Sequence, residues 1–231
     1  MRSFLSRAAF AAALVLVNAG VASAHVSVLT GPAQAAKSQK ITFAIGHGCG
    51  TSDTLSVRIE IPTGISSVRA LPSDFGRVSI EGTATAVTAV VWTKPISEIQ
   101  DSDFSYYELS IRARVADVPF RKIYFRIFQT CRAMDGTPST HNWIALPGET
   151  GDPAPAVTVV PSRVAGWNKY TLTTPVVAAD LPTYFGDAHI VWRGAEAYSP
   201  NANTMTLIGG TAGVSVLGTD LSANQEIWVK Y

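Results

Sequence analysis

The residue with the most chemistry to offer is His25, which directly follows the tripeptide Ala22-Ser23-Ala24. That tripeptide has the small-x-small form at which signal peptidases cut, and cleavage after Ala24 would give His25 a free α-amino group. The amine and the imidazole of one residue can hold one metal ion as a chelate. Nitrogen ligands in tetragonal geometry suit Cu(II), and the low pKa of the amine, about 8, lets copper displace its proton at neutral pH. His25 therefore predicts a Cu(II) site, which zinc or nickel would fill less tightly.

The start of the chain predicts export. Arg2 and Arg7 precede an apolar run over residues 8–17, so we interpret residues 1–24 as a signal peptide and exclude them from the fold. An uncleaved membrane anchor is the alternative, but the run is shorter than the ~20 residues that a spanning helix needs. No later segment is apolar for long enough to cross a bilayer. We expect a periplasmic or secreted protein with no membrane span in its mature form.

The net charge limits the classes of binding partner, and the cysteine content predicts a disulfide. The chain has 18 Lys and Arg against 17 Asp and Glu, a net charge of +1, and no basic block, so neither nucleic acid nor an anionic membrane is an expected partner. The two cysteines are Cys49 and Cys131. Disulfides persist in the compartments that export leads to, which favours a bridge between them. Metal ligation by one or both thiolates is the alternative.

Residues 25–160 have the pattern of an all-β sandwich. Short runs rich in Val, Ile, Thr, Tyr and Phe alternate with clusters of Gly, Pro, Asp and Ser. In LSVRIEIP the apolar Leu55, Val57 and Ile59 alternate with polar residues, which predicts one buried and one wet face. The expected strands are HVSVLT, QKITFAIGH, LSVRIEIP, RVSIEG, TAVVWTK, YYELSIRARV, KIYFRIFQTC and HNWIAL, and VTVVPS could follow as a final strand.

Residues 161–231 differ from this pattern. They follow PGETGDPAPA, residues 147–156, whose Pro and Gly content is typical of a linker or a long surface loop. AHIVWRG is interpreted as a buried strand, SPNANTMTLIGG as a short helix ended by glycine, and EIWVKY as a closing strand. We expect a small appended α/β unit that packs on the sandwich or on a partner.

An ordered set of motifs resembles a known family. AHVSV, FAIGHGC, VRIEIPTGI, VVWTK, YYELSIRARV, FRIFQTC and HNWIALPG follow one another as in the YcnI-like domain family, over about residues 25–160. The resemblance implies an immunoglobulin-like or cupredoxin-like sandwich that binds Cu(II) through a one-histidine brace. In that family the amine and imidazole of the first mature histidine, a strand-end glutamate and a tryptophan form the site. His25 matches the histidine and Trp143 in HNWIAL matches the tryptophan.

The family's glutamate does not carry over, because this chain has GHGC where the glutamate is expected. His47 in that motif could replace it as a second imidazole ligand, or it could be a loop histidine bound to backbone. His141 shares a strand face with Trp143 and is a further candidate ligand. The alternative is that His141 is a solvated histidine at the end of a strand. Trp143 would exclude water from the metal, whereas a purely core role is the alternative.

Other polar and aromatic residues are given structural roles. Trp92 alternates within a strand and is expected in the core. Asp53 is an available carboxylate, Glu60 is expected to be solvated on a strand's polar face, and His189 is expected to be structural.

Three function classes follow. We favour a copper(II)-binding protein of copper homeostasis, a chaperone, store or delivery factor that could pass copper to a periplasmic acceptor protein. The second is a histidine-brace copper oxidase or monooxygenase, in which Tyr106, Tyr107 or Tyr124 could be the axial residue. An enzyme is not expected, because common catalytic motifs and an aromatic-studded substrate surface are not apparent. The third class is a metal-free interaction sandwich.

Overall fold

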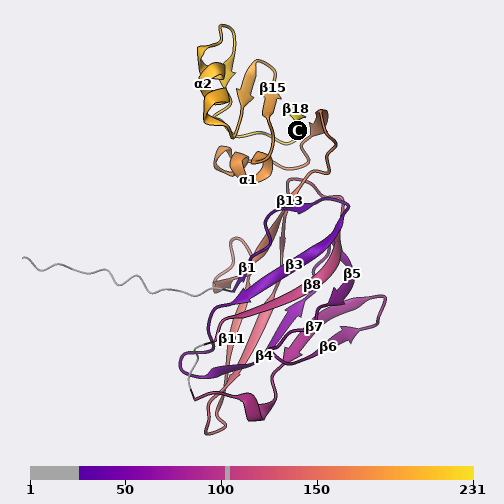
Figure 1. The fold of residues 1–231 in the computed structure, drawn as a ribbon, viewed down its shortest axis with the longest axis vertical. Coiled ribbons are helices and arrows are strands. Elements are labelled where there is room, and N and C mark those ends of the chain that lie inside the picture. Colours follow the sequence, from indigo (N-terminus) through magenta and orange to yellow (C-terminus); the bar gives the residue numbers. More distant parts are fainter. Residues whose placement is uncertain (1–25, 102–104) are drawn as a thin grey trace, which may run out of the picture.

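The computed structural model describes residues 26–101 and 105–231, and these form a β-sandwich with a smaller unit at one end (Figure 1). One layer of the sandwich has four strands, in the order β1 (Ser27–Val28), β3 (Ser38–Ile45), β8 (Tyr107–Val115) and β5 (Ile65–Ala70). The other has six, in the order β12 (Asp152–Pro153), β11 (Pro138–Ala145), β10 (Ile127–Arg132), β4 (Asp53–Glu60), β7 (Val87–Thr93) and β6 (Arg77–Gly82). A third, short sheet joins β2 (Ala33–Gln34), β13 (Ala156–Val160) and β9 (Lys122–Tyr124). The predicted all-β sandwich is confirmed.

The sandwich core forms where the apolar faces of the strands meet. Val57 and Ile59 of β4 are fully buried, as the alternation in LSVRIEIP predicts, and Trp92 of β7 is also fully buried, which confirms its core role. Phe43 of β3 meets Phe125 edge to face, with ring centroids 4.9 Å apart. These side chains belong to one continuous cluster, so the two layers share a single core.

The prediction of one strand over KIYFRIFQTC is wrong. The segment breaks at Phe125 and Arg126: β9 pairs with β13, whereas β10 pairs with β4 and β11. Phe125 is fully buried at the break. The β propensity of the residues is high on both sides of the bend, so the sequence does not reveal it. The bend depends on which strands the two halves pair with. Strand β5, over ISSVRA, was not expected.

Residues beyond the sandwich form the expected small α/β unit. Its sheet has the order β14 (Trp167–Thr171), β18 (Glu226–Lys230), β15 (Ile190–Arg193), β16 (Glu196–Tyr198) and β17 (Ser215–Val216). The helices are α1 (Leu181–Phe185) and α2 (Ala202–Gly210), with short 3₁₀ turns η1 (Ile96–Glu98) in the sandwich and η2 (Ala178–Asp180) before α1. The Asn201 side chain accepts hydrogen bonds from the amides of Asn203 and Thr204 and so caps α2. None of the helices within the described ranges is long and apolar enough to cross a bilayer.

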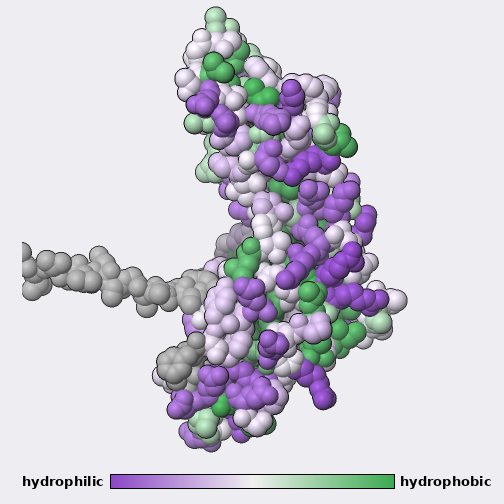
Figure 2. Space-filling view, viewed as in Figure 1, coloured by the Kyte–Doolittle hydropathy of each residue, from purple (hydrophilic) through white to green (hydrophobic). Residues whose placement is uncertain are grey.

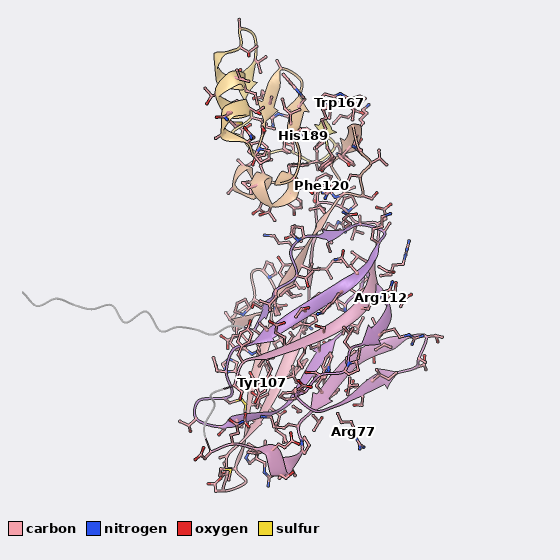
Figure 3. The ribbon with its side chains drawn as sticks, in the orientation of Figure 1. Arg77, Tyr107, Arg112, Phe120, Trp167 and His189 are labelled. Carbon is pink, nitrogen blue, oxygen red and sulfur yellow. A yellow bond between two sulfur atoms is a disulfide. The ribbon has the colours of Figure 1, made fainter. Side chains whose placement is uncertain are left out.

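Phe120 joins the sandwich to the C-terminal unit. Its φ is +66°, an uncommon backbone conformation for a residue other than glycine, and its side chain lies in the core of the C-terminal unit rather than in that of the sandwich (Figure 3). The hydroxyls of Thr174 and Tyr184 both donate to the Phe120 carbonyl oxygen, at 2.8 and 3.2 Å. The unit expected over residues 161–231 therefore completes its core with a residue of the preceding sandwich.

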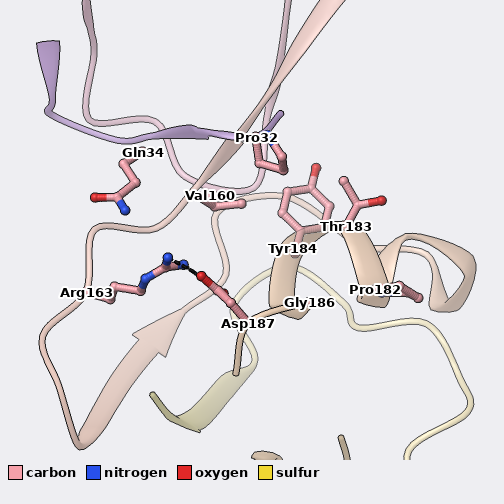
Figure 4. A pocket seen from close by; sticks show the side chains of 9 residues that line it. All are labelled: Pro32, Gln34, Val160, Arg163, Pro182, Thr183, Tyr184, Gly186 and Asp187. Atoms are coloured by element: carbon pink, nitrogen blue, oxygen red, sulfur yellow. Dashed lines mark hydrogen bonds and ion pairs between the residues drawn. The ribbon is translucent and has the colours of Figure 1, made fainter. Parts of the chain in front are cut away.

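A hollow of about 430 Å³ lies at this junction (Figure 4). Within it Arg163 Nη1 donates to Asp187 Oδ1 at 2.8 Å, so the two charged groups neutralise each other. The lining contains no histidine or cysteine, which makes it unsuited to a soft or borderline metal ion. The lining residues are Pro32, Gln34, Val160, Arg163, Pro182, Thr183, Tyr184, Gly186 and Asp187.

Strand register creates a basic row that the sequence does not show. Lys40, Arg112 and Arg69 lie directly opposite one another on β3, β8 and β5, and all three are exposed. Figure 2 shows hydrophilic residues gathered on this side of the sandwich, and Arg112 is labelled in Figure 3. None of the three pairs with a carboxylate of the described residues. Like charges in direct register repel, so this row attracts anions.

The stability of the fold is expected to fall as pH rises above about 10. Burial raises the pKa of the Tyr184 phenol to about 12. Because the folded chain holds this proton more tightly than the unfolded chain, deprotonation favours unfolding, at a loss of about 2 kcal/mol by pH 12. Urea unfolding between pH 8 and 11.5 measures the loss. The Tyr184→Phe variant should show a shallower decline, and an unchanged decline would contradict the assignment to Tyr184.

Candidate functional site

The candidate site is at the end of β3, where His47 follows two residues after the strand. In the antiparallel pair of β1 and β3, Ser27 lies opposite Ala44 and Val28 opposite Phe43. The N-terminal end of β1 therefore lies beside the C-terminal end of β3, from which His47 extends. His25 lies outside the described residues, as do the predicted signal peptide and its cleavage site.

The His47 ring has a defined proton position. Its Nδ1 hydrogen-bonds to the carbonyl oxygen of Gly48, and because a carbonyl oxygen only accepts, Nδ1 must carry the proton. In the neutral ring the lone pair is then on Nε2. Ligating histidines commonly use one ring nitrogen for the metal and donate from the other to a carbonyl or carboxylate. A His47 ring with its proton on Nδ1 is therefore compatible with a metal ion on Nε2.

Two bonds hold the His47 segment against β10. Gln129 Nε2 donates to the His47 carbonyl oxygen at 2.6 Å, and Cys49 forms a disulfide with Cys131, whose Cα atoms are 5.8 Å apart. The predicted disulfide is confirmed, so these thiols are not metal ligands and a blue-copper site is excluded. Gln129 and Cys131 are two residues apart on β10 and both point inward. The loop carrying His47 is thus anchored at two points on one strand.

Gln129 also connects the backbone of His47 to Trp143 and lies opposite His141. Gln129 is 1% exposed; its Nε2 also donates to Thr54 Oγ1 at 2.8 Å, and its Oε1 accepts from Trp143 Nε1 at 3.4 Å. His141 lies directly opposite Gln129 in the β10–β11 pair. Gln129 was not among the residues predicted from the sequence, because a buried amide is recognised only once the strand register is known.

Trp143 and His141 form a stacked pair. Their ring centroids are 4.3 Å apart with 18° between the planes, and Trp143 is 2% exposed within the sandwich core. His141 Nε2 lies 2.7 Å from Asp152 Oδ2, an acidic partner that the sequence analysis also missed. This carboxylate orients the His141 ring in the way that outer-shell acids orient ligating histidines. The structure therefore connects three of the four proposed metal-site residues.

The donors here fit copper. Two imidazoles are present, the His47 tautomer leaves Nε2 available, and His141 is oriented by Asp152; imidazole suits Cu(II). Within residues 26–101 and 105–231 no group of three or more His, Cys, Asp and Glu residues has the arrangement of a metal site. A complete site would therefore need a further ligand from beyond these ranges, and the N-terminal position of His25 would supply both an amine and an imidazole.

The other sequence candidates are engaged elsewhere. The interpretation of Asp53 as an available carboxylate is wrong: it is fully buried, and its Oδ2 accepts from Lys94 Nζ at 2.6 Å. Tyr107 donates its hydroxyl to Asp53 Oδ1 and accepts from Lys94, so it is not free to be an axial residue. Tyr106 is 57% exposed, and Tyr124 lies on β9 beside a hollow that the C-terminal unit helps to line.

Glu60 and His189 are both near the surface. Glu60 accepts from Arg58 at 2.8 Å on the outer side of the sheet. The exposed His189 contributes its backbone amide and carbonyl, which bond to Lys230 and Ser199. Neither side chain is part of the candidate site.

The family model described as "Domain of unknown function (DUF1775)" matches residues 25–160. The chain belongs to the DUF1775 family. This is the YcnI-like family that the sequence motifs resemble, and its match spans the sandwich and every residue of the candidate site. No curated protein matches the sequence.

Several solved structures are similar in fold to this DUF1775 protein. An uncharacterised protein from Nocardia farcinica with an immunoglobulin-like fold has 18% identity and a TM-score of 0.48, covering 59% of this chain and 99% of its own. A non-cellulosomal cohesin from Archaeoglobus fulgidus has 9% identity and a TM-score of 0.36, covering 59% and 92%. The major pilin subunit BcpA of Bacillus cereus has 12% identity and a TM-score of 0.36, covering 89% and 55%. At these similarities the comparison concerns the fold and not the function.

Proposed function

We propose that this protein binds Cu(II) through the amine and imidazole of His25 together with His47, and that it acts in copper homeostasis as a chaperone, store or delivery factor. One observation carries the proposal. The His47 segment is anchored by Gln129 and by the Cys49–Cys131 disulfide beside Trp143 and His141, at the end of β3 next to the start of β1. That is where a brace formed by the first mature residue would need its additional ligands.

Each residue of the proposed copper site has a distinct role. His25 would hold the ion as a chelate, and His47 Nε2 would add an imidazole whose position is set before the metal arrives. His141, oriented by Asp152, is a further nitrogen donor, and the Trp143 indole beneath it would exclude water. Copper would supply a strongly bound divalent ion with accessible one-electron chemistry. The hydrogen bonds of Gln129 hold the His47 segment in place, which lowers the ordering cost of binding the ion.

The compartment belongs to the same proposal. A disulfide fits an oxidising environment, and a periplasmic or secreted location would follow from cleavage after Ala24. Mass spectrometry of the exported protein gives its first residue. A mature chain that begins anywhere other than at His25 would remove the amine from the site and overturn the brace.

Replacing His47 should weaken copper binding. We expect His47→Ala to raise the Kd for Cu(II) at least about 10–100-fold, the loss typical of removing even an outer-shell partner. Isothermal titration with Cu(II), and the nitrogen hyperfine pattern in the electron paramagnetic resonance spectrum, would measure the loss of one imidazole. His189→Ala is the matched control, because that exposed histidine lies on the C-terminal unit. Equal affinities for the two variants would show that His47 is not a ligand.

A histidine-brace copper oxidase or monooxygenase is the second candidate. The expectation from sequence that an aromatic-studded surface is lacking is wrong, because Trp167, Trp192 and Trp228 form an open face, although this face lies on the C-terminal unit and not at the candidate metal site. Incubation of the copper-loaded protein with ascorbate, peroxide and oligosaccharides, followed by mass analysis of the sugars, separates the two. Oxidised sugar products would show that the protein is an enzyme and would overturn the chaperone proposal. If the protein does not bind copper at all, the metal-free interaction sandwich would be the better description.

A further inference from the structure

Three tryptophans share one face of the C-terminal sheet. Trp167, Trp228 and Trp192 come from the adjacent strands β14, β18 and β15. Trp228 lies directly opposite Trp192, and Trp167 lies opposite Lys230, two residues further along β18. Residues that are directly opposite, or two apart on one strand, point to the same side of a sheet. The three indoles therefore line one hollow of about 400 Å³, where Gly194 adds no side chain.

This face is open, whereas the other face of the sheet is buried. Val191, Ile227 and Val229 alternate with the tryptophan-bearing positions and are fully buried in the core of the C-terminal unit. Trp167 and Trp228 are 51% and 48% exposed, and no element of the described chain covers them. Figure 3 shows Trp167 on the C-terminal unit, well separated from the sandwich residues Tyr107 and Arg77. Clustered exposed aromatic surface of this kind marks binding sites.

Lysines alternate with the indoles and give the face its charge. Lys169 Nζ lies 5.8 Å from the Trp228 ring centroid, and Lys230 Nζ lies 6.0 Å from that of Trp167, both within cation–π range. Lys169 is paired with Glu226 at 2.7 Å. No carboxylate in the described part of the chain pairs with Lys230. The face therefore presents an uncompensated ammonium group between two exposed indoles.

We propose that this tryptophan face, formed by Trp167, Trp192, Trp228, Lys169 and Lys230, binds a chain of acidic sugars. The C–H groups of a pyranose ring carry slight positive charge and pack on the negative face of an indole. A sugar carboxylate can then pair with the Lys230 ammonium, which supplies the charge complementarity that a neutral glycan lacks. With strands ~4.8 Å apart, three strands extend about 10 Å, which accommodates two linked sugar rings.

The same features disfavour two other occupants. A second copy docked by a two-fold axis would bring the same lysine-bearing face against itself, and the Glu226 carboxylate that could pair with Lys230 of the other copy is already held by Lys169 at 2.7 Å. Insertion into a lipid surface would bury the Lys169 and Lys230 ammonium groups beside the two exposed rings, and burial of a charged group away from water is costly. An extended acidic glycan satisfies both the stacking surface and the charge.

Binding of the processed full-length chain to tetragalacturonate tests the proposal, with a neutral cello-oligosaccharide of equal length as comparison. We expect saturable binding of the acidic probe by calorimetry, a shift in tryptophan fluorescence, and affinity that falls with added salt. Trp167→Ala and Trp228→Ala should each weaken binding about 10-fold, whereas Trp228→Phe should retain most of it. Lys230→Gln should weaken acidic-probe binding and leave the neutral comparison unchanged. Leu207→Ala, at a 70% exposed position on α2, is the control.

Several results would overturn this assignment. They are no binding of the acidic probe by the wild-type chain, equal binding by the tryptophan variants despite unchanged circular dichroism, or a preference for the neutral glycan. Binding to phosphatidylglycerol vesicles that Trp228→Ala abolishes would assign the face to a lipid surface. A concentration-dependent dimer lost in the same variant would assign it to self-association. Copper titrations of the tryptophan variants should match those of the wild type.

Discussion

A form of the mature protein whose His25 α-amine is acetylated should bind Cu(II) about two to three orders of magnitude more weakly than the form with a free amine. Acetylation turns the primary amine of His25 into an amide and leaves no other amine beside the imidazole, so the chelate loses one arm. An amide nitrogen with no neighbouring amine to anchor the ion does not give up its proton to copper at neutral pH as readily as an α-amine does. The expected loss corresponds to about 3–4 kcal/mol of binding free energy. Competition titration against a chelator of known affinity measures it.

The comparison has a built-in control, because both forms keep His47, His141, Trp143 and the disulfide. Far-ultraviolet circular dichroism and the thermal midpoint of the copper-free forms should be identical. His25→Ala in the processed chain keeps the amine but removes the imidazole, and it should weaken binding by a similar amount. If the acetylated and free-amine forms bind copper equally, the chelate does not exist and the interaction sandwich is the better description.

The sequence was sufficient for those parts of the fold that depend on local pattern. Alternation placed Val57 and Ile59 in the core, and a chain with two cysteines had one obvious disulfide. The family motifs pointed to Trp143, and the departure from them at GHGC pointed to His47, whose carbonyl oxygen the structure connects to Trp143 through the Gln129 side chain. Such features follow from residue type and spacing alone, and do not require knowledge of which strands are neighbours.

The missed features all depend on strand order and register. Gln129 became visible as the support of the site only when β10 was paired with β11, and Asp152 only when β12 was placed beside β11. Trp167 and Trp228 are distant in sequence and meet because β14 and β18 are neighbours. The same holds for the basic row across β3, β8 and β5. Pairing between distant segments is set by the whole sheet, so residue patterns within one segment do not disclose it.

The candidate metal site and the tryptophan face belong to different units, which Phe120 connects. The sandwich supplies the histidines, whereas the C-terminal unit supplies the indoles and takes Phe120 into its own core. A change in one site should therefore leave the binding free energy of the other nearly unchanged, as distant independent sites are usually additive. This independence is what makes the copper titration of Trp228→Ala informative.

Replacing Lys94 by Met should lower the free energy of unfolding by about 3–5 kcal/mol, the usual cost of leaving one partner of a buried ion pair unpaired. Lys94 is 4% and Asp53 0% exposed, and their side chains meet at 2.6 Å. Burial by itself would lower the pKa of Lys94, but the hydrogen bonds to Asp53 and Tyr107 outweigh it and the pKa is raised. Lys94 is therefore charged in the folded protein, and Met in its place would leave the Asp53 carboxylate buried without its cation.

Urea unfolding at pH 7 measures this loss, and a double variant assigns its cause. Asp53→Asn combined with Lys94→Met removes both charges, so it should recover most of the stability that the single variant loses. Lys122→Met is the matched control, because Lys122 and Asp180 form an exposed pair at 3.5 Å whose loss should cost only about 0–1 kcal/mol. If the double variant is as unstable as Lys94→Met alone, then lost packing against Phe75 and Tyr107, over whose rings Lys94 lies, is the cause instead of the unpaired carboxylate.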